Sequence, residues 1–234
     1  MTPDNALSPS LQKGAGPAFE LKFVLTLDEA ARAEEWARSY LAPDPHGLDG
    51  AYRTLSLYCD TPRRDVFHRV RGYRRSKYRV RRYEQGDFLH LERKKRCGDR
   101  VSKKRSVLPL DRLPLVETAD PEPEWDWGWF LRQIRQRELL PAARLGYART
   151  AFMGDGSGPM RLTIDRELAG EPVQGWGVGA LTDPRPLLPG QAVLELKYAD
   201  VLPAPFKQLL SLLPPNRPGG ASKYRLCMRA WGLT

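Results

Sequence analysis

The sequence predicts an α+β protein in which about eight antiparallel strands close into a barrel around a charged tunnel, with helices flanking its outer surface. Residues 76–106 contain three alternating runs separated by turn-forming residues, a pattern typical of a three-stranded antiparallel meander. Most of the other predicted strands also carry Glu, Lys or Arg at one parity, with apolar residues at the other. Closing such a sheet into a barrel removes its edges and turns the charged face into the lining of a tunnel.

Strands are predicted wherever apolar and polar residues alternate between turn-forming segments. In chain order these strands cover residues 19–25, 52–60, 78–81, 89–94, 101–105, 143–152, 160–168 and 193–198. Two short segments, 84–87 and 97–99, contain the glycine and aspartate residues that favour turns between the strands of the meander. The glycine-rich segment 170–179 is expected to be a hairpin or an irregular strand.

Helices are predicted where a capping residue or a proline begins a segment without alternation. In chain order they cover residues 29–40, 63–70, 125–140, 204–213 and 222–231. Asp28 is expected to cap the first helix and Ser222 the last one. The proline- and acid-rich segment 108–123 is expected to be a connector, and the tryptophans after it to pack on the outside of the sheet.

The meander gathers positive charge on one face, because residues two apart in a strand point to the same side. The cations that share that face are Arg79, Arg81, Lys94, Lys103 and Arg105. One basic strand is usually a solvated surface, but like charges opposite each other on three consecutive strands destabilise a sheet. This face therefore predicts a polyanionic ligand.

The bulk composition favours a protein that works with anions in a reducing compartment. The 234 residues carry a formal net charge of +10, which predicts anionic partners. The three cysteines show neither a paired motif nor metal-ligand spacing, which argues against a disulfide scaffold or a zinc site. No signal peptide or bilayer-spanning apolar run is visible, so we expect a cytoplasmic protein with a flexible tail, 1–18, and a single domain, 19–234.

Eight short motifs, in order along the chain, resemble VTC domains, which belong to the CYTH-like triphosphate tunnel metalloenzyme superfamily. The motifs are Phe19-Glu20-x-Lys22-Phe23, Tyr78-Arg79-x-Arg81, Glu92-Arg93-Lys94, Ser102-Lys103-x-Arg105, Tyr147-x-Arg149-Thr150-Ala151-Phe152, Arg161-x-Thr163-x-Asp165, Leu194-Glu195-x-Lys197 and Ser222-Lys223-Tyr224. The resemblance covers residues 19 to about 231. Each motif is weak alone, but eight in order are specific for the fold.

The resemblance implies a tunnel that binds a triphosphate or polyphosphate chain together with Mn²⁺ or Mg²⁺. In the eukaryotic VTC complex such a domain polymerises polyphosphate from ATP. The implied phosphate-binding residues are Lys22, Arg79, Arg81, Lys94, Lys103, Arg105, Arg149, Arg161 and Lys197. Glu195 is implied as a metal ligand with Glu20 as a second candidate, and Lys223 as the catalytic lysine beside the phosphates.

Two features depart from the family pattern. The chain shows neither an SPX domain nor the membrane spans of eukaryotic VTC proteins, so a membrane partner protein is a further candidate. Its first strand carries Glu-x-Lys where most CYTH enzymes have Glu-x-Glu-x-Lys, which disfavours ordinary CYTH triphosphatase or cyclase chemistry.

Three functions remain open at this point. The first is a polyphosphate polymerase that transfers the γ-phosphoryl group of ATP to a growing chain, which needs positioned charges and no protein nucleophile. The second is a metal-dependent triphosphatase that uses water as the acceptor. The third is a non-catalytic polyphosphate binder. Nucleic acid is not expected, because aromatic residues are not spread among the basic ones.

Three neighbouring charged residues have simpler interpretations. Asp165 is expected to pair with Arg149 or Arg161, and Glu92 with Lys94, rather than to bind metal. His90 is expected to be a spectator on the tunnel wall.

Overall fold

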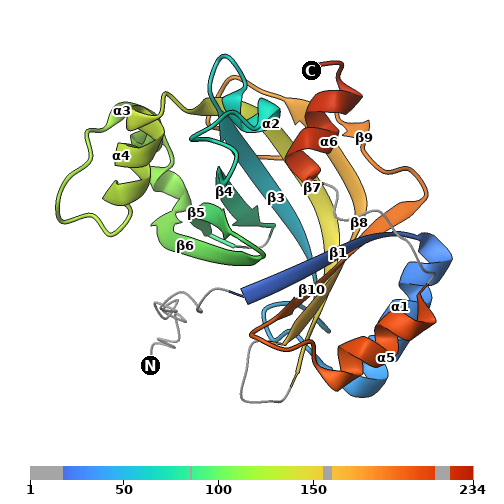
Figure 1. The fold of residues 1–234 in the computed structure, drawn as a ribbon. Coiled ribbons are helices and arrows are strands. Elements are labelled where there is room, and N and C mark those ends of the chain that lie inside the picture. The colour runs from blue at the N-terminus through green and yellow to red at the C-terminus, as the bar shows by residue number, and fades with distance from the viewer. Residues whose placement is uncertain (1–17, 85, 155–159, 214–221, 234) are drawn as a thin grey trace, which may run out of the picture.

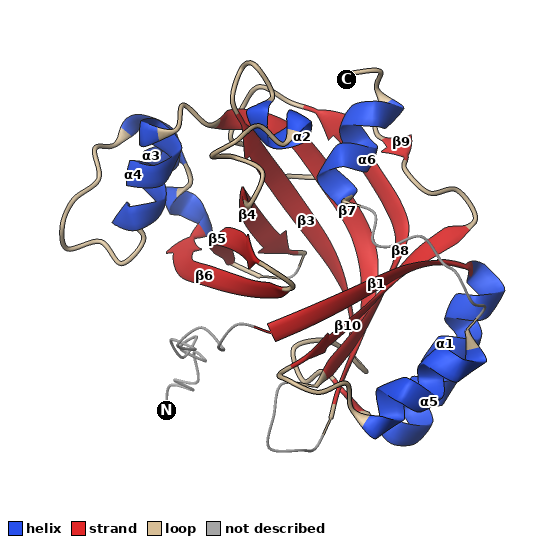
Figure 2. Cartoon of the chain, viewed as in Figure 1, coloured by secondary structure: helices blue, strands red, loops and turns tan. Residues whose placement is uncertain are grey.

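The computed structural model describes residues 18–84, 86–154, 160–213 and 222–233, and eight of its strands close into an antiparallel barrel (Figures 1 and 2). The ring runs β7-β3-β4-β5-β6-β1-β10-β8 and returns to β7. Its strands are β1 (Ala18–Thr26), β3 (Ala51–Asp60), β4 (Ser76–Tyr83), β5 (Phe88–Cys97), β6 (Arg100–Pro109), β7 (Leu140–Met153), β8 (Arg161–Pro172) and β10 (Gln191–Tyr198). Two-residue strands, β2 (Ala42–Pro43) and β9 (Arg185–Pro186), extend the sheet beside β7 and β8. The predicted α+β barrel is confirmed.

Several predicted boundaries are wrong. The helix predicted at 125–140 is the shorter α4 (Gly128–Gln136), because β7 already begins at Leu140. The helix predicted at 63–70 is the single turn α2 (Asp65–His68), flanked on both sides by residues with positive φ. The connector 108–123 holds the end of β6, a 3-10 turn η1 (Leu110–Arg112) and α3 (Pro114–Thr118). The glycine-rich segment begins as the end of β8, and most of the tail lies outside the described residues.

The first helix, α1 (Leu27–Tyr40), is capped earlier than predicted. Thr26, not Asp28, occupies the N-cap position. Its hydroxyl accepts the Glu29 backbone N–H at 3.3 Å, while the Glu29 carboxylate accepts the Thr26 N–H at 2.8 Å. This reciprocal capping box satisfies two helix donors, which explains why the threonine begins the helix.

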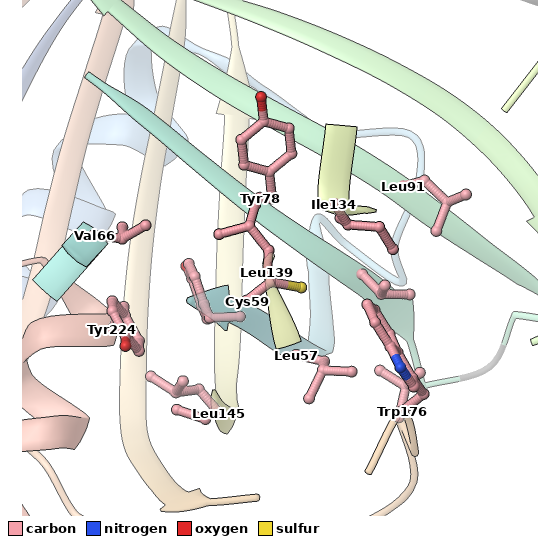
Figure 3. Packing of buried hydrophobic residues seen from close by; sticks show 14 of the residues in the cluster. Leu57, Cys59, Val66, Tyr78, Leu91, Ile134, Leu139, Leu145, Trp176 and Tyr224 are labelled. Carbon is pink, nitrogen blue, oxygen red and sulfur yellow. The ribbon is translucent and has the colours of Figure 1, made fainter. Parts of the chain in front are cut away.

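The apolar faces of the strands point outward and are covered by helices. α1 and α5 (Ala204–Leu212) lie together over β8 and β10, as Figure 1 shows at the lower right, and pack with them into one core. α4 covers the outer face of β4, β5 and β6, where Trp127 and Trp129 are buried as predicted. The last helix, α6 (Lys223–Ala230), packs against β7 and β8, and Figure 3 shows its Tyr224 within the second core. The charged faces are thereby left to line the barrel.

The barrel is closed unevenly. β1 and β10 pair over eight residue positions, whereas β1 and β6 pair only at Ala18 with Val101 and at Phe19 with Arg100. Beyond Phe19, β1 passes the tip of the β5–β6 hairpin. The lumen therefore opens beside this tip, and that opening defines the mouth of the site.

Candidate phosphate-binding tunnel

A cavity of about 700 Å³ occupies the barrel lumen. All twelve residues predicted from the sequence line it: Glu20, Lys22, Arg79, Arg81, Lys94, Lys103, Arg105, Arg149, Arg161, Glu195, Lys197 and Lys223. Eleven of them project from strands at the predicted parity, and Lys223 enters from the first turn of α6. The structure thus places them in one site, while their individual roles remain predictions.

Three of these cations surround one carboxylate that is shut off from water. Glu92 on β5 is 0% exposed and accepts hydrogen bonds from Arg79 at 2.7 Å, Lys103 at 2.9 Å and Arg105 at 2.8 Å. Glu92 therefore does not pair with Lys94, because the register places Arg79 and Arg105 directly opposite it on the two neighbouring strands. Glu92 therefore holds three cations of the tunnel at once.

A second cluster joins the two predicted metal ligands. The Lys22 ammonium contacts the Glu20 carboxylate at 2.9 Å and also hydrogen-bonds Glu195. Lys94 donates to both oxygens of Glu20, at 2.6 and 2.7 Å. The two glutamates therefore face a shared point on the lumen wall that an ammonium now occupies.

The third cluster contains the predicted catalytic lysine. The Lys223 ammonium lies 2.5 Å from Asp165 and 3.2 Å from Glu195, and its side chain is 6% exposed. Asp165 is also held by Arg149 through two hydrogen bonds of 2.6 and 2.8 Å, which confirms one of its two predicted partners. Lys223 is therefore linked to the second cluster through Glu195.

The strand β3 lines the lumen with neutral hydroxyl groups. Tyr58 accepts a hydrogen bond from Arg79 at 3.1 Å, and Ser56 accepts one from Arg81 at 3.2 Å. These two hydroxyl groups help to orient the guanidinium planes of Arg79 and Arg81. No site residue was predicted on this strand, although its hydroxyl-bearing residues share one parity.

Arg161 and Thr163 lie on the same inward face of β8. Arg161 hydrogen-bonds the buried Asp44 and, at 2.8 Å, the hydroxyl of Tyr52. The hydroxyl of Thr163 is buried in the cavity wall and has no hydrogen-bond partner among the described residues. A buried hydroxyl without a partner is costly, which favours a polar ligand at this position.

The structure adds lining residues that the sequence reasoning missed. Lys77 precedes Arg79 at the same parity, and its ammonium donates to the hydroxyl of Ser222 at 2.7 Å. The strand parity already pointed to Lys77. The remaining additions, Arg69, Arg74, Arg75, Arg96 and Arg225, come mostly from loops and strand ends, where no periodicity marks them.

The pKa values of the tunnel carboxylates are set by two opposing effects, burial and the nearby positive charges. Burial raises the pKa of Glu20, but Lys22 and Lys94 outweigh it and lower that pKa to about 2. The pKa values of Glu92 and Glu195 lie well below the usual range because adjacent cations outweigh the same burial effect. These carboxylates are therefore ionised at neutral pH, and the lumen holds a dense array of ion pairs.

Two tunnel tyrosines are predicted to titrate unusually early when the tunnel is empty. Burial raises the pKa of Tyr83, but Arg81 and Arg105 outweigh it and lower that pKa to about 7. The pKa of Tyr58 falls to about 8 because Arg79 and Arg81 similarly outweigh its burial. An anion in the tunnel adds negative charge, so we expect inorganic triphosphate to raise both pKa values.

Ultraviolet absorbance of tyrosinate measures this effect directly. Tyr83→Phe is expected to remove the earlier transition and leave that of Tyr58. If no phenolate forms below the ordinary tyrosine pKa of 10.0, the positive potential assigned to the lumen is wrong.

The family assignment rests on the whole chain. A family model described as the VTC domain matches residues 18–231. The chain belongs to the VTC domain family. The resemblance drawn from the eight sequence motifs is confirmed, and the match includes every residue of the tunnel described above.

Solved structures share the fold of this VTC domain. A protein of Pyrococcus horikoshii OT3 is 15% identical with a TM-score of 0.51, over 92% of this chain and 99% of that one. A Hippeastrum protein, described as a putative adenylyl cyclase with a dominant triphosphatase activity, is 18% identical with a TM-score of 0.50, over 91% of this chain and 96% of that one. At these identities the likeness shows the fold alone, and a search of curated proteins finds no match. The family match and the shared fold together identify a VTC domain with a triphosphate-tunnel fold.

The carboxylates of the tunnel fit a divalent cation that substrate also binds. Among the described residues, no group of three or more His, Cys, Asp or Glu side chains is arranged to hold an ion. Mg²⁺ and Mn²⁺ prefer oxygen ligands, and Mg²⁺ is often held by one or two carboxylates plus substrate phosphates. Glu20 and Glu195 fit this arrangement when a phosphate chain supplies the remaining oxygens.

A separate observation concerns membranes. None of the helices in the described part of the chain is long and apolar enough to cross a bilayer.

Proposed function

We propose that this VTC domain is a polyphosphate polymerase that transfers the γ-phosphoryl group of ATP to the end of a polyphosphate chain. The observation that supports this over simple triphosphate hydrolysis is that the cavity is lined by more cations than those predicted to bind a triphosphate. The cavity is lined by the ten predicted cations of the lumen and by six further cations at its mouth.

The mouth differs from the lumen in its charge balance. Inside, ten cations share the carboxylates of Glu20, Glu92, Asp165 and Glu195. The mouth adds Arg69, Arg74, Arg75, Lys77, Arg96 and Arg225. Asp99 is the one carboxylate among the described residues that line this part of the cavity. A triphosphate in the lumen leaves these mouth cations without a partner, whereas a longer polyanion reaches them.

Lys77 connects the two regions. Burial, together with the nearby charges of Lys22 and Lys94, lowers the pKa of Lys77 to about 8. Its position between these lumen lysines and the exposed Arg75 makes the cationic path continuous. The like-charge repulsion along this path is relieved when phosphates lie on it.

The lumen residues perform the reaction by positioning and electrostatics. Arginines on β4, β6 and β7 bind phosphate oxygens, and the Lys223 ammonium lies 3.2 Å from Glu195, one of the two carboxylates that would hold the metal. A terminal phosphate oxygen of the chain attacks the γ-phosphorus of ATP, the bond to the β-phosphate oxygen breaks, and ADP leaves. Mn²⁺ or Mg²⁺, held by Glu195 and Glu20, would neutralise charge that develops on the phosphate oxygens. Fixed cations stabilise the same charge without rearranging during the reaction.

The direct test incubates the purified protein with ATP and Mn²⁺ and follows polymer and free phosphate in parallel. We expect long-chain polyphosphate, detected by gel staining, together with ADP. Free phosphate without polymer would identify a triphosphatase instead. If neither polymer nor free phosphate forms but the protein binds polyphosphate tightly, the protein is a non-catalytic polyphosphate binder.

Because cations line the mouth, we predict that the affinity of the protein for polyphosphate depends on the length of the polyphosphate chain. Arg74→Ala/Arg75→Ala is expected to weaken binding of long-chain polyphosphate about tenfold, because two exposed ion contacts contribute up to about 1 kcal/mol each. Binding of inorganic triphosphate should not change, since it fits within the lumen. Calorimetric titration without metal measures both affinities.

The matched control is Arg112→Ala/Arg132→Ala, which removes the same charge from exposed residues outside the cavity. The mouth assignment fails if both double variants behave alike or if triphosphate affinity falls equally. An oligonucleotide that competes at the affinity of polyphosphate would instead assign the mouth to nucleic acid.

A further inference from the structure

Lys223 reaches the tunnel from α6, and the next residue of this helix binds the protein core instead of the tunnel. The next residue, Tyr224, is 1% exposed and lies among the buried hydrophobic side chains of the core (Figure 3). Its hydroxyl donates a hydrogen bond of 2.6 Å to the carboxylate of Asp60. The two neighbouring side chains of α6 therefore bind different parts of the molecule, one the tunnel carboxylates and the other the end of β3.

Asp60 is built into the fold as an anchor. It is the last residue of β3 and is 1% exposed. Besides Tyr224, its carboxylate accepts the backbone N–H groups of Thr61 at 2.7 Å, Val66 at 2.8 Å and Phe67 at 2.9 Å. Four donors satisfy this buried charge, and they join β3, α2 and α6 in one network.

Aromatic packing leaves the ring of Tyr224 little freedom. The ring stacks on Tyr58 with centroids 5.7 Å apart and meets Phe67 edge-on at 6.5 Å. On the other side of α6, a Cβ atom on Gly170 would lie 2.9 Å from the sulfur of Cys227, so glycine permits the close approach of helix and strand. The helix is therefore held by specific contacts on both flanks.

Charged groups in the tunnel both attract and repel the ammonium of Lys223. Burial lowers the pKa of the Lys223 ammonium, but the attraction of Asp165 and Glu195 outweighs it, while Lys22 repels the ammonium. A metal ion bound by Glu195 would add to this repulsion. The position of the ammonium is therefore set both by these charges and by the backbone of α6 that carries it.

We propose that Asp60 and Tyr224 are positioning residues, which hold α6 so that the ammonium of Lys223 stays beside the phosphate chain. The inference rests on the proposed function for the role of Lys223, while its geometry is independent of which reaction occurs. Because Lys223 and Tyr224 are consecutive on one turn, any displacement at Asp60 also displaces the ammonium.

The test is a double-mutant cycle in which calorimetry measures the affinity for inorganic triphosphate. A chelator is present, so that no metal is bound and no turnover occurs. We expect Tyr224→Phe to weaken binding about tenfold, the size expected when a displaced ammonium loses its charged hydrogen bond to a phosphate oxygen. Asp60→Asn should act in the same direction. In the Lys223→Ala background, Tyr224→Phe should cause no further loss, because no ammonium remains to be positioned.

The matched control is Tyr78→Phe, which removes another buried tyrosine hydrogen bond, 2.8 Å to Gln133, on the outer side of the barrel. It should lower the melting temperature, though by less because Gln133 is neutral, and should leave triphosphate affinity unchanged. Equal affinity losses for both phenylalanine variants, or an undiminished loss in the Lys223→Ala background, would overturn the proposal. If the wild type synthesised no polymer, the proposed function would be refuted. The binding cycle could still be interpreted, because it measures triphosphate affinity without turnover.

Discussion

Lys223→Ala is expected to reduce polyphosphate synthesis about a thousandfold, the scale found when one fixed charge-stabilising group is removed from an active site. The variant should still fold. Asp165 keeps both hydrogen bonds from Arg149, and Glu195 keeps Lys22, so no buried carboxylate loses its last cation. Initial rates with ATP and Mn²⁺, measured beside a thermal melting curve, check both parts of this expectation.

The control for this variant is Lys207→Ala, which makes the same change on an exposed position of α5. Its rate should equal that of the wild type. A Lys223→Ala variant with normal rate and normal melting would show that the ammonium is a structural ion-pair partner and that the catalytic role lies elsewhere in the tunnel.

Glu92→Gln is expected to destabilise the empty protein by about 3 kcal/mol and to make its stability depend on anions. The substitution leaves Arg79, Lys103 and Arg105 around a neutral group, and breaking a buried ion cluster from one side is costly. We give the lower end of the usual range because Lys103 and Arg105 are about one third exposed and so keep contact with water. Inorganic triphosphate supplies the missing negative charge, so its stabilising effect should be larger than in the wild type.

Thermal unfolding with and without triphosphate measures this difference. The control is Glu171→Gln, because Glu171 is also buried and paired, with Arg144 at 2.5 Å, but Arg144 does not line the cavity, whereas the partners of Glu92 do. Glu171→Gln should destabilise the protein without increasing the effect of triphosphate. If the two variants respond alike to the anion, Glu92 does not set the charge of the tunnel.

Most of the site was predictable because alternation along a strand is a local property. Once a segment is a strand, residues two apart share a face whatever the strand pairs with. Arg79 and Arg81 are two residues apart, as are Lys103 and Arg105. The sequence alone therefore assigns the members of each pair to one face of their strand. The same rule pointed to Lys77, which the prediction left out.

The mouth and the ends of the helices were not predictable in this way. Arg69 and Arg74 lie in a loop between α2 and β4, where no repeat relates one side chain to the next. The end of α4 was misplaced because the strand β7 includes Leu140, and a sheet ladder outweighs local helix preference. Thr26 caps α1 because its side chain and that of Glu29 satisfy each other.

The sequence by itself determined the sign of the tunnel, the strands that line it and the family to which the chain belongs. Apart from the pairing of Asp165 with Arg149, which charges meet was decided by the tertiary structure. Glu92 pairs with Arg79 and Arg105 because strand register sets them opposite it, and Lys94 pairs with Glu20 from a strand 74 positions away in the sequence. Ion pairing depends on distances across the closed barrel, and those distances exist only after the strands have paired and the barrel has closed.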